Sequence, residues 1–182
     1  MPNGRQAAIS TVQPSGVRAI GWWRCGGRRG WGMRTVDRIT IRAPLERVFA
    51  VAVEVERWPS FLPHYRWVRV WDRTTERATV EMAAWRPFGV VRYPTWWVSE
   101  MEVVPQQAVR YRHVQGITRG MDVEWQFGLE PEGVAVTIVH QWRGPSWPVI
   151  GRLAAEWVIG PVFIHGIASR TLAGVKQYLE AA

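Results

Sequence analysis

Cysteine and lysine are nearly absent from this sequence of 182 residues, in which Cys25 and Lys176 are the only examples. A single cysteine excludes an internal disulfide bond and is typical of proteins in a reducing compartment, so we expect a cytoplasmic location. No stretch reaches the run of about 20 apolar residues that a membrane-spanning helix needs. The sequence also lacks internal repeats, a glycine-rich phosphate loop, a Ser-His-Asp arrangement and paired catalytic carboxylates, and we expect no cofactor.

Acidic residues are missing from the first 34 positions, which contain six arginines. Six of the eight net positive charges therefore lie there, which leaves +2 for the remainder of the chain. A fold that binds nucleic acid should concentrate its positive charge in the folded domain. This charge distribution argues against a nucleic-acid partner.

Residues 1–34 are predicted to form a basic flexible tail, and residues 35–182 a single domain. The tail is punctuated by glycine and proline, and it has no apolar stretch long enough for a signal peptide. Met33 stands two residues before the first predicted strand. A native start at Met33, without residues 1–32, is therefore an open alternative.

Tryptophan is the abundant residue, with 13 in the chain. An indole ring supplies a large apolar face and one N–H donor, so this surplus indicates a ligand pocket or an adhesive surface in addition to a core. A densely filled core is the alternative explanation. Apolar residues make up 47% and charged residues 21% of the chain, which places it among globular proteins.

The N-terminal part of the domain predicts one strand followed by two short helices. Residues 35–42 alternate between apolar and polar side chains, as a strand does. Pro44 then opens a helix, because a proline in the first turn loses no hydrogen bond. Apolar residues at helical spacing, among them Val48 and Ala52, give this helix one buried face. The proline-bracketed residues 59–63 predict a second short helix or turn.

Six strands and a long helix are predicted next. Two-residue periodicity places the strands at about 64–72, 76–85, 90–103, 107–115, 121–130 and 134–143. Ser146 can then cap a helix that continues to about Glu180 and carries an apolar stripe. Gly160-Pro161 lies inside that stretch and should kink or break the helix. A small sheet can bury so long a helix only by curling around it.

The glycine-containing turns at residues 116–120 and 130–133 fix an expected register for the last three strands, because a slip of one residue would invert every side chain. The expected rows of inward side chains are Tyr111, Trp125 and Ile138 in one, and His113, Val123 and His140 in the next.

Four segments carry a resemblance to a known family. They are Ala43-Pro44-Leu45-Glu46-Arg47-Val48-Phe49, Trp58-Pro59-Ser60-Phe61-Leu62-Pro63, Val68-Arg69-Val70 and Ala78-Thr79-Val80-Glu81-Met82. With the order of elements, they make residues 35–179 similar to the START-like helix-grip superfamily (SRPBCC). Within it, the chain resembles the polyketide cyclase/dehydrase and lipid-transport group, which includes coenzyme Q-binding-like proteins.

The resemblance implies an α+β fold in which a curved antiparallel sheet of about seven strands wraps a long C-terminal helix. The implied order is one strand, two helices, six strands and one helix. The space between sheet and helix is the usual ligand site of this superfamily. Members bind lipids, quinones, polyketides or plant hormones, and a minority do chemistry on the bound molecule.

The side chains expected to face this cavity are mostly aromatic, as is usual for a small-molecule pocket. They are Tyr93, Trp97, Tyr111, His113, Trp125, Phe127, Ile138, His140, Trp142, Trp157 and His165. His113 and His140 are expected about 9–10 Å apart, two strands along one face, where they could hold one polar group between them. No residues have metal-ligand spacing and no inward carboxylate is expected beside the histidines, so we predict no metal site. Simple filling of the core by these side chains is the alternative to a cavity.

Three functions fit this sequence. The first is non-catalytic binding or transport of a hydrophobic small molecule such as a lipid, a quinone or a polyketide. The second is a polyketide cyclase or dehydratase, for which His113, His140 and Tyr111 are the acid–base candidates. The third is a protein- or membrane-interaction module that uses the outward Trp85 and Trp96. Few polar groups are expected inside the cavity, which favours binding over catalysis.

Overall fold

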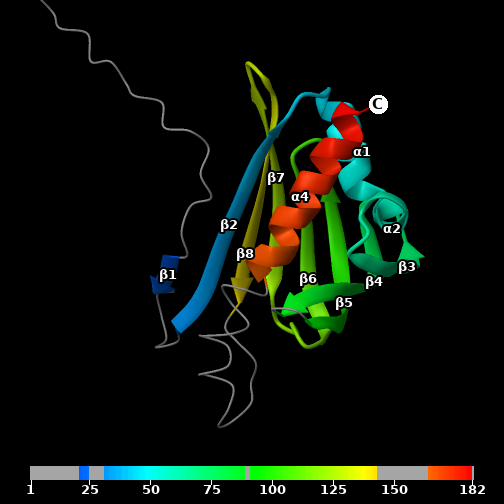
Figure 1. The fold of residues 1–182 in the computed structure, drawn as a ribbon, viewed down its shortest axis with the longest axis vertical. Helices are drawn as coiled ribbons and strands as arrows, with labels where there is room; N and C mark the ends of the chain where they lie inside the picture. Colours follow the sequence, from blue (N-terminus) through cyan, green and yellow to red (C-terminus); the bar gives the residue numbers. More distant parts are fainter. Residues whose placement is uncertain (1–20, 25–30, 89–90, 143–163, 182) are drawn as a thin grey trace, which may run out of the picture.

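The computed structural model describes residues 21–24, 31–88, 91–142 and 164–181, which form one antiparallel sheet with helices on one of its faces (Figure 1). The strands are β1 (Gly21–Arg24), β2 (Trp31–Ile41), β3 (Tyr65–Arg73), β4 (Arg77–Phe88), β5 (Val91–Val104), β6 (Ala108–Gly116), β7 (Asp122–Glu130) and β8 (Gly133–Trp142). The helices are α1 (Leu45–Val53), the 3-10 turn η1 (Val55–Arg57), α2 (Trp58–Phe61) and α4 (His165–Glu180).

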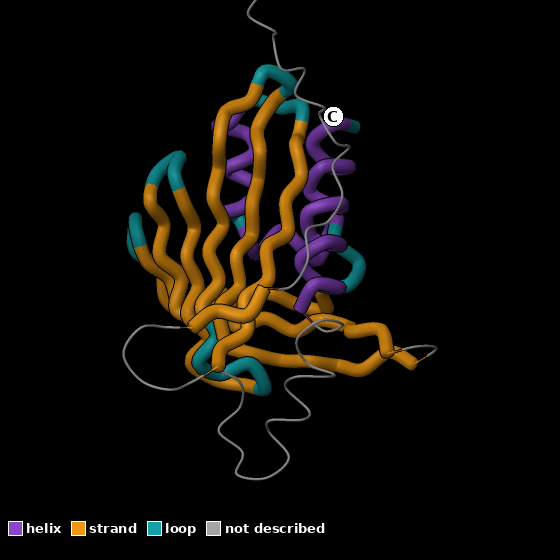
Figure 2. Tube along the Cα trace, turned by 90° about the vertical axis from the view of Figure 1, so that its left-hand side faces the viewer, coloured by secondary structure: helices purple, strands orange, loops and turns teal. Residues whose placement is uncertain are grey.

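The eight strands lie in the order β1-β2-β8-β7-β6-β5-β4-β3. Strands β3 to β8 are neighbours in sequence as well as in space, and β2 adds to the far side of β8. The sheet bends strongly, so that its strands run in clearly different directions in Figure 2, with α1 and α4 on the same side of it. Irregular pairing in β3 and between β5 and β6 contributes to the bend, because a β-bulge increases the local twist.

Helix α4 covers the sheet with one apolar stripe. Ile167, Leu172, Val175 and Leu179 are all buried, as helical spacing predicts for one face. The helix has 16 residues and is therefore about 24 Å long. No helix in the described ranges is long and apolar enough to cross a membrane.

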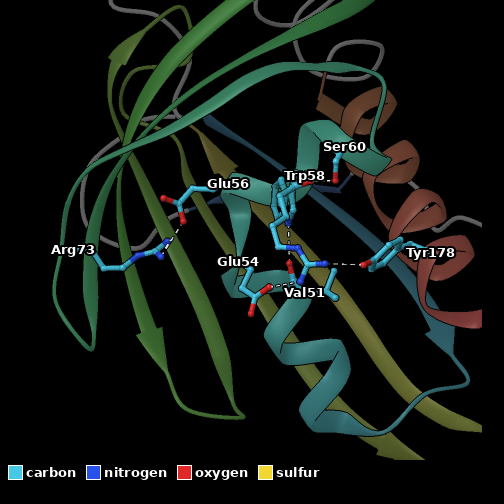
Figure 3. Close-up of polar contacts among 8 residues, drawn as sticks. Val51, Glu54, Glu56, Trp58, Ser60, Arg73 and Tyr178 are labelled. Atoms are coloured by element: carbon cyan, nitrogen blue, oxygen red, sulfur yellow. Dashed lines mark hydrogen bonds and ion pairs between the residues drawn. The ribbon is translucent and has the colours of Figure 1, made fainter. Parts of the chain in front are cut away.

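Polar contacts tie α1, η1 and α2 to one another and to α4 (Figure 3). The Arg57 guanidinium donates to a Glu54 carboxylate oxygen at 2.8 Å and to the Tyr178 hydroxyl of α4 at 3.0 Å. The buried Trp58 indole donates its N–H to the carbonyl of Val51 at 2.9 Å. These bonds fix the Trp58 ring against α1 and attach the neighbouring Arg57 to α4.

The C-terminal end of α4 is attached to the end of β2. Glu180 accepts a hydrogen bond from the backbone N–H of Arg42 at 2.8 Å and another from the Lys176 ammonium at 2.7 Å. Lys176 also donates to the carbonyl of Thr40 at 2.6 Å. Arg42 and Glu180 lie 138 positions apart in the chain, so this contact closes the domain.

The predicted α+β fold, with a curved antiparallel sheet and a C-terminal helix, is confirmed. The six strands of the meander lie within about three residues of their predicted bounds, and Pro44 does precede the first helix. Strand β2 begins at Trp31, however, before the predicted domain start at residue 35, and β1 pairs with it from within the predicted tail. The predicted helix from Ser146 to Gly160-Pro161 lies outside the described residues.

The predicted register is correct for β7 and β8 and wrong for β6. Trp125 pairs with Ile138 and Val123 with His140, as expected. Tyr111, however, pairs with Val123 rather than with Trp125, which is a shift of two residues. The connection between the two strands begins earlier than the predicted turn at residues 116–120, because the backbone of His113 already bonds to Met121 and Gly120. A shift of two keeps every side chain on its predicted face.

Candidate functional site

A cavity of about 60 Å³ lies between the sheet and α4. Side chains from α2, from strands β3 to β8 and from α4 line it. None of the described lining residues is an arginine, a lysine, an aspartate or a glutamate. The walls are therefore apolar and aromatic, with a few neutral polar groups among them.

Six of the predicted cavity residues meet at these walls. They are Trp97, Tyr111, His113, Trp125, Ile138 and His140. Two others lie nearby without lining the cavity. Phe127 packs edge-on against Phe49 of α1, with ring centroids 5.2 Å apart, and the Trp142 indole donates to the carbonyl of Arg119 at 3.0 Å. Trp157 and the side chain of His165 fall outside the described part of the structure.

Tyr93 does not reach the cavity, and its assignment is wrong. Its side chain is 51% exposed, although Trp97, which has the same parity on β5, is buried. The alternation of side chains along β5 places Tyr93 and Trp97 on the same face and cannot show which of them is covered, because the end of the β4–β5 hairpin extends past the helices (Figure 2).

His113 and His140 are buried and each is oriented by a threonine. Nδ1 of His113 lies 2.7 Å from the Thr118 hydroxyl, and the His113 ring stacks on Trp97 with an interplanar angle of 14°. Nδ1 of His140 lies 3.3 Å from the hydroxyl of Thr35 on β2. Because of the register shift, the row of His140 contains Val123 and Tyr111 instead of His113.

Tyr111 has the most unusual polar group in the cavity. Its side chain is 6% exposed, and its hydroxyl has no hydrogen-bond partner in the described structure. Burial raises the pKa of Tyr111 far above its ordinary value, and the nearby Tyr65 raises it further. The phenol therefore remains protonated and is available as a neutral hydrogen-bond donor.

A group of hydrogen-bonded polar side chains beside α4 was not predicted from the sequence. The Thr171 hydroxyl lies 3.0 Å from Nε2 of His64 and 3.4 Å from the hydroxyl of Tyr65. Thr171 is a polar residue inside the apolar stripe of the helix, and that position was the available signal. Trp58 and Met82 also line the cavity and were missed, because neither lies on the strands whose register was read. Met121 was missed although it shares the inward parity of Val123 and Trp125.

A buried carboxylate also contradicts the expectation from sequence. Asp37 on β2 is 4% exposed and shares the inward parity of Thr35, the hydrogen-bond partner of His140. The strand pattern hid it, because Val36 and Ile39 have opposite parity and left the inward face ambiguous. Among the described residues, no group of three histidine, cysteine or acidic side chains is arranged to hold a metal ion.

A larger hollow, of about 810 Å³, lies on the sheet face that carries the exposed side chains. Two of its carboxylates pair with one arginine. Arg110 donates to Glu124 at 2.9 Å and approaches Glu102 at 3.5 Å, and the hydrogen bond from Arg110 lowers the pKa of Glu124. Glu100 and Asp122 are exposed on the same face. This face is charged and solvated, so the smaller apolar cavity is the better candidate site.

The two tryptophans predicted to point outward do so to different degrees. Trp96 is 37% exposed and donates its indole N–H to Glu81 at 2.6 Å. Trp85 is half-buried beneath the Arg66 guanidinium, which lies 4.6 Å from its ring centroid and 4.8 Å from that of Trp67. These stacked pairs stabilise the outer face of β3 and β4. Their use in binding a protein or a membrane stays a prediction.

Comparison with known proteins gives a consistent result. The family model described as polyketide cyclase / dehydrase and lipid transport matches residues 41–159. A protein of Streptomyces halstedii named as a candidate polyketide cyclase is 28% identical over 101 residues, which cover 55% of this chain and 92% of that protein.

Two solved structures share the fold. A protein from Thermus thermophilus has a TM-score of 0.69 at 21% identity, over 81% of this chain and 97% of its own. The di-domain aromatase/cyclase of the steffimycin biosynthetic pathway also has a TM-score of 0.69, at 18% identity, over 82% of this chain. The match spans 52% of that di-domain chain, about half its length.

Proposed function

Because the chain belongs to the polyketide cyclase/dehydrase and lipid transport family, we propose that it binds or carries a hydrophobic small molecule in the cavity between the sheet and α4. The observation that carries this proposal is the lining itself. Three indole rings, from Trp58, Trp97 and Trp125, face a space that also contains a buried hydroxyl without a partner. Apolar walls with a few placed polar groups are characteristic of small-molecule sites.

The small volume means that a ligand must displace side chains as it enters. Ligand pockets generally measure about 300–1,000 Å³, whereas this cavity measures about 60 Å³. Met82 and Met121 stand in its walls, and methionine side chains adapt to new shapes more readily than branched or aromatic ones. A cavity that widens only when its ligand enters fits a carrier, because the small cavity without ligand leaves little room for water.

Native mass spectrometry of the purified protein tests this function, because a carried ligand should remain bound and can then be identified. Titration with an uncharged hydrophobic fluorescent probe such as N-phenyl-1-naphthylamine measures the site directly. Trp125→Ala should weaken probe binding, since it removes a wall that lies 5.4 Å from the Trp58 ring centroid. Trp71→Ala is the matched control, because Trp71 is 55% exposed and does not line the cavity. Unchanged binding in a folded Trp125→Ala variant would count against the cavity.

A second function, polyketide cyclisation with dehydration, is favoured by the relatives named above and by the two buried histidines. In such a reaction a base removes a proton from a carbon beside a ketone, and that carbon attacks a second ketone of the chain. The new hydroxyl then leaves as water when a second proton is removed. His113 or His140 would act as the base, and the protonated Tyr111 would donate to the ketone oxygen.

The two functions differ in how they respond to loss of both histidines. Replacing His113 and His140 together by glutamine should abolish cyclisation of a linear poly-β-ketone thioester if the protein is an enzyme. A carrier should keep the same substrate bound and unchanged, with or without the histidines. Thr118 and Thr35 engage Nδ1 of each ring, so acid–base work by either histidine would fall to its Nε2 atom.

A further inference from the structure

We infer that the cavity selects planar ligands with an uncharged carbonyl group, and that the Tyr111 hydroxyl donates the hydrogen bond that recognises it. This inference rests on the proposed binding function and specifies its ligand class. Three independent features of the cavity support it: an unsatisfied donor, the absence of charged groups among the described lining residues, and flat walls.

The donor is the Tyr111 hydroxyl. A buried polar group without a partner keeps an uncompensated desolvation cost, and Tyr111 is 6% exposed with its hydroxyl unsatisfied in the described structure. A ligand that accepts this hydrogen bond recovers that free energy, whereas a hydrocarbon ligand does not. The site is therefore built to prefer an oxygen acceptor.

The charge of the acceptor is restricted by what surrounds it. No arginine or lysine is among the described residues that line the cavity. Arg73 is the one cation with a resolved electrostatic effect on Tyr111, and it is held by Glu56 at 2.9 Å (Figure 3). A carboxylate or phosphate that entered would lose its hydration, and among the described lining residues only the imidazoles of His113 and His140 could supply a positive charge in return. Fatty acids and other anions should therefore bind more weakly than uncharged ligands.

The walls favour a flat ring over a flexible alkyl chain. Trp97 and His113 are stacked nearly parallel, with an interplanar angle of 14°. Trp58 and Trp125 form a second aromatic wall, tilted by 34°. A planar aromatic ligand can stack against such surfaces, and offset stacking of rings is worth more than their contact area alone.

Three probes of nearly equal shape separate these contributions: 2-acetylnaphthalene, 2-ethylnaphthalene and 2-naphthoate. The full-length protein should bind the ketone about fivefold to tenfold more tightly than the ethyl compound, and the carboxylate at least tenfold more weakly than the ketone, by isothermal titration calorimetry. Tyr111→Phe should remove the preference for the ketone and leave ethylnaphthalene binding within twofold. Tyr93→Phe makes the same chemical change at an exposed tyrosine and should keep the preference.

A second measurement does not depend on affinity. The carbonyl stretching band of the bound ketone should move to lower wavenumber in the wild-type protein and return in Tyr111→Phe, because a hydrogen bond weakens the C=O bond. Equal affinity for ketone and ethyl compound, or a preference that survives Tyr111→Phe, overturns the inference and leaves the binding function standing. Tighter binding of the carboxylate than of the ketone also overturns it. Failure of all three probes to bind overturns the binding function itself.

Discussion

Gly116, at the end of β6, permits a close approach of two backbones that shapes one wall of the cavity. Its φ angle is +91°, and a Cβ placed there would fall far inside contact distance of the Trp96 carbonyl oxygen and 2.8 Å from Cα of Trp97. Gly120, at the other end of the same turn, has a φ angle of +83° but no atom within 4 Å of such a Cβ. The two glycines therefore share a backbone conformation and differ in crowding.

We expect Gly120→Ala to destabilise the fold by about 1 kcal/mol. A side chain in the left-handed region costs about 1–2 kcal/mol, and the lower entropy of the unfolded alanine chain offsets about 0.4–1 kcal/mol of this. Gly116→Ala should cost about 3 kcal/mol. Its methyl group must also push β5 away from β6 at the Trp97–Gly116 pair, which weakens the neighbouring ladder hydrogen bonds, each worth about 1 kcal/mol.

Thermal unfolding followed by circular dichroism measures this difference. For a chain of this size, 1 kcal/mol corresponds to about 2–4 °C in Tm, so Gly120→Ala should lower Tm by about 2–4 °C and Gly116→Ala by about 6–12 °C. Because Trp97 stacks on His113, the Gly116 variant should also change the near-ultraviolet signal of the folded state. Equal losses of Tm in the two variants would refute the argument, since φ alone would then explain both.

Three further outcomes are expected. Glu180→Gln should destabilise the fold near neutral pH, because the hydrogen bonds from Lys176 and from the Arg42 backbone lower the pKa of Glu180. In urea titrations, the difference in unfolding free energy between wild type and variant should vanish as pH falls from about 4.3 through that lowered pKa. An advantage that persists at pH 2 would contradict this linkage. Gly166→Ala should raise Tm slightly, because a Cβ there meets nothing within 4 Å and alanine favours a helix by up to about 1 kcal/mol. Trp58→Phe should cost about 2–3 kcal/mol in chemical denaturation, since it shortens a buried ring and leaves a backbone carbonyl without its donor; a loss below about 0.5 kcal/mol would show that the indole N–H matters little.

Local patterns were sufficient to predict the strands and the family. Period-two alternation placed all six meander strands, and the segment from Ala43 to Phe49 carried a resemblance that the family match over residues 41–159 confirms. The face of each strand was also predictable, because parity survives a register error of two residues. Trp125, Ile138 and His140 therefore face the cavity as expected.

The features that needed the structure all depend on geometry between segments. Tyr93 has the correct parity and is still exposed, because parity says nothing about where the covering helices end. Thr171 reaches Tyr65 and His64 across more than 100 residues of sequence, a distance at which no local pattern operates. The missing hydrogen bond of Tyr111 is likewise a property of its whole surroundings, and composition could not reveal it.

The pairing of β2 with β8 has a consequence for the time at which the domain can close during synthesis. Thr35 on β2 and His140 on β8 are 105 residues apart, and at about 5–20 residues per second β8 is made roughly 5–20 s after β2. The meander from β3 to β8 can form in the order of its synthesis, but the edge of β2 that will meet β8 must wait. Contacts of such long sequence separation slow folding, because the chain must be ordered before they form. The cavity wall that contains His140, which Thr35 contacts from β2, is therefore among the last parts of the sheet to assemble.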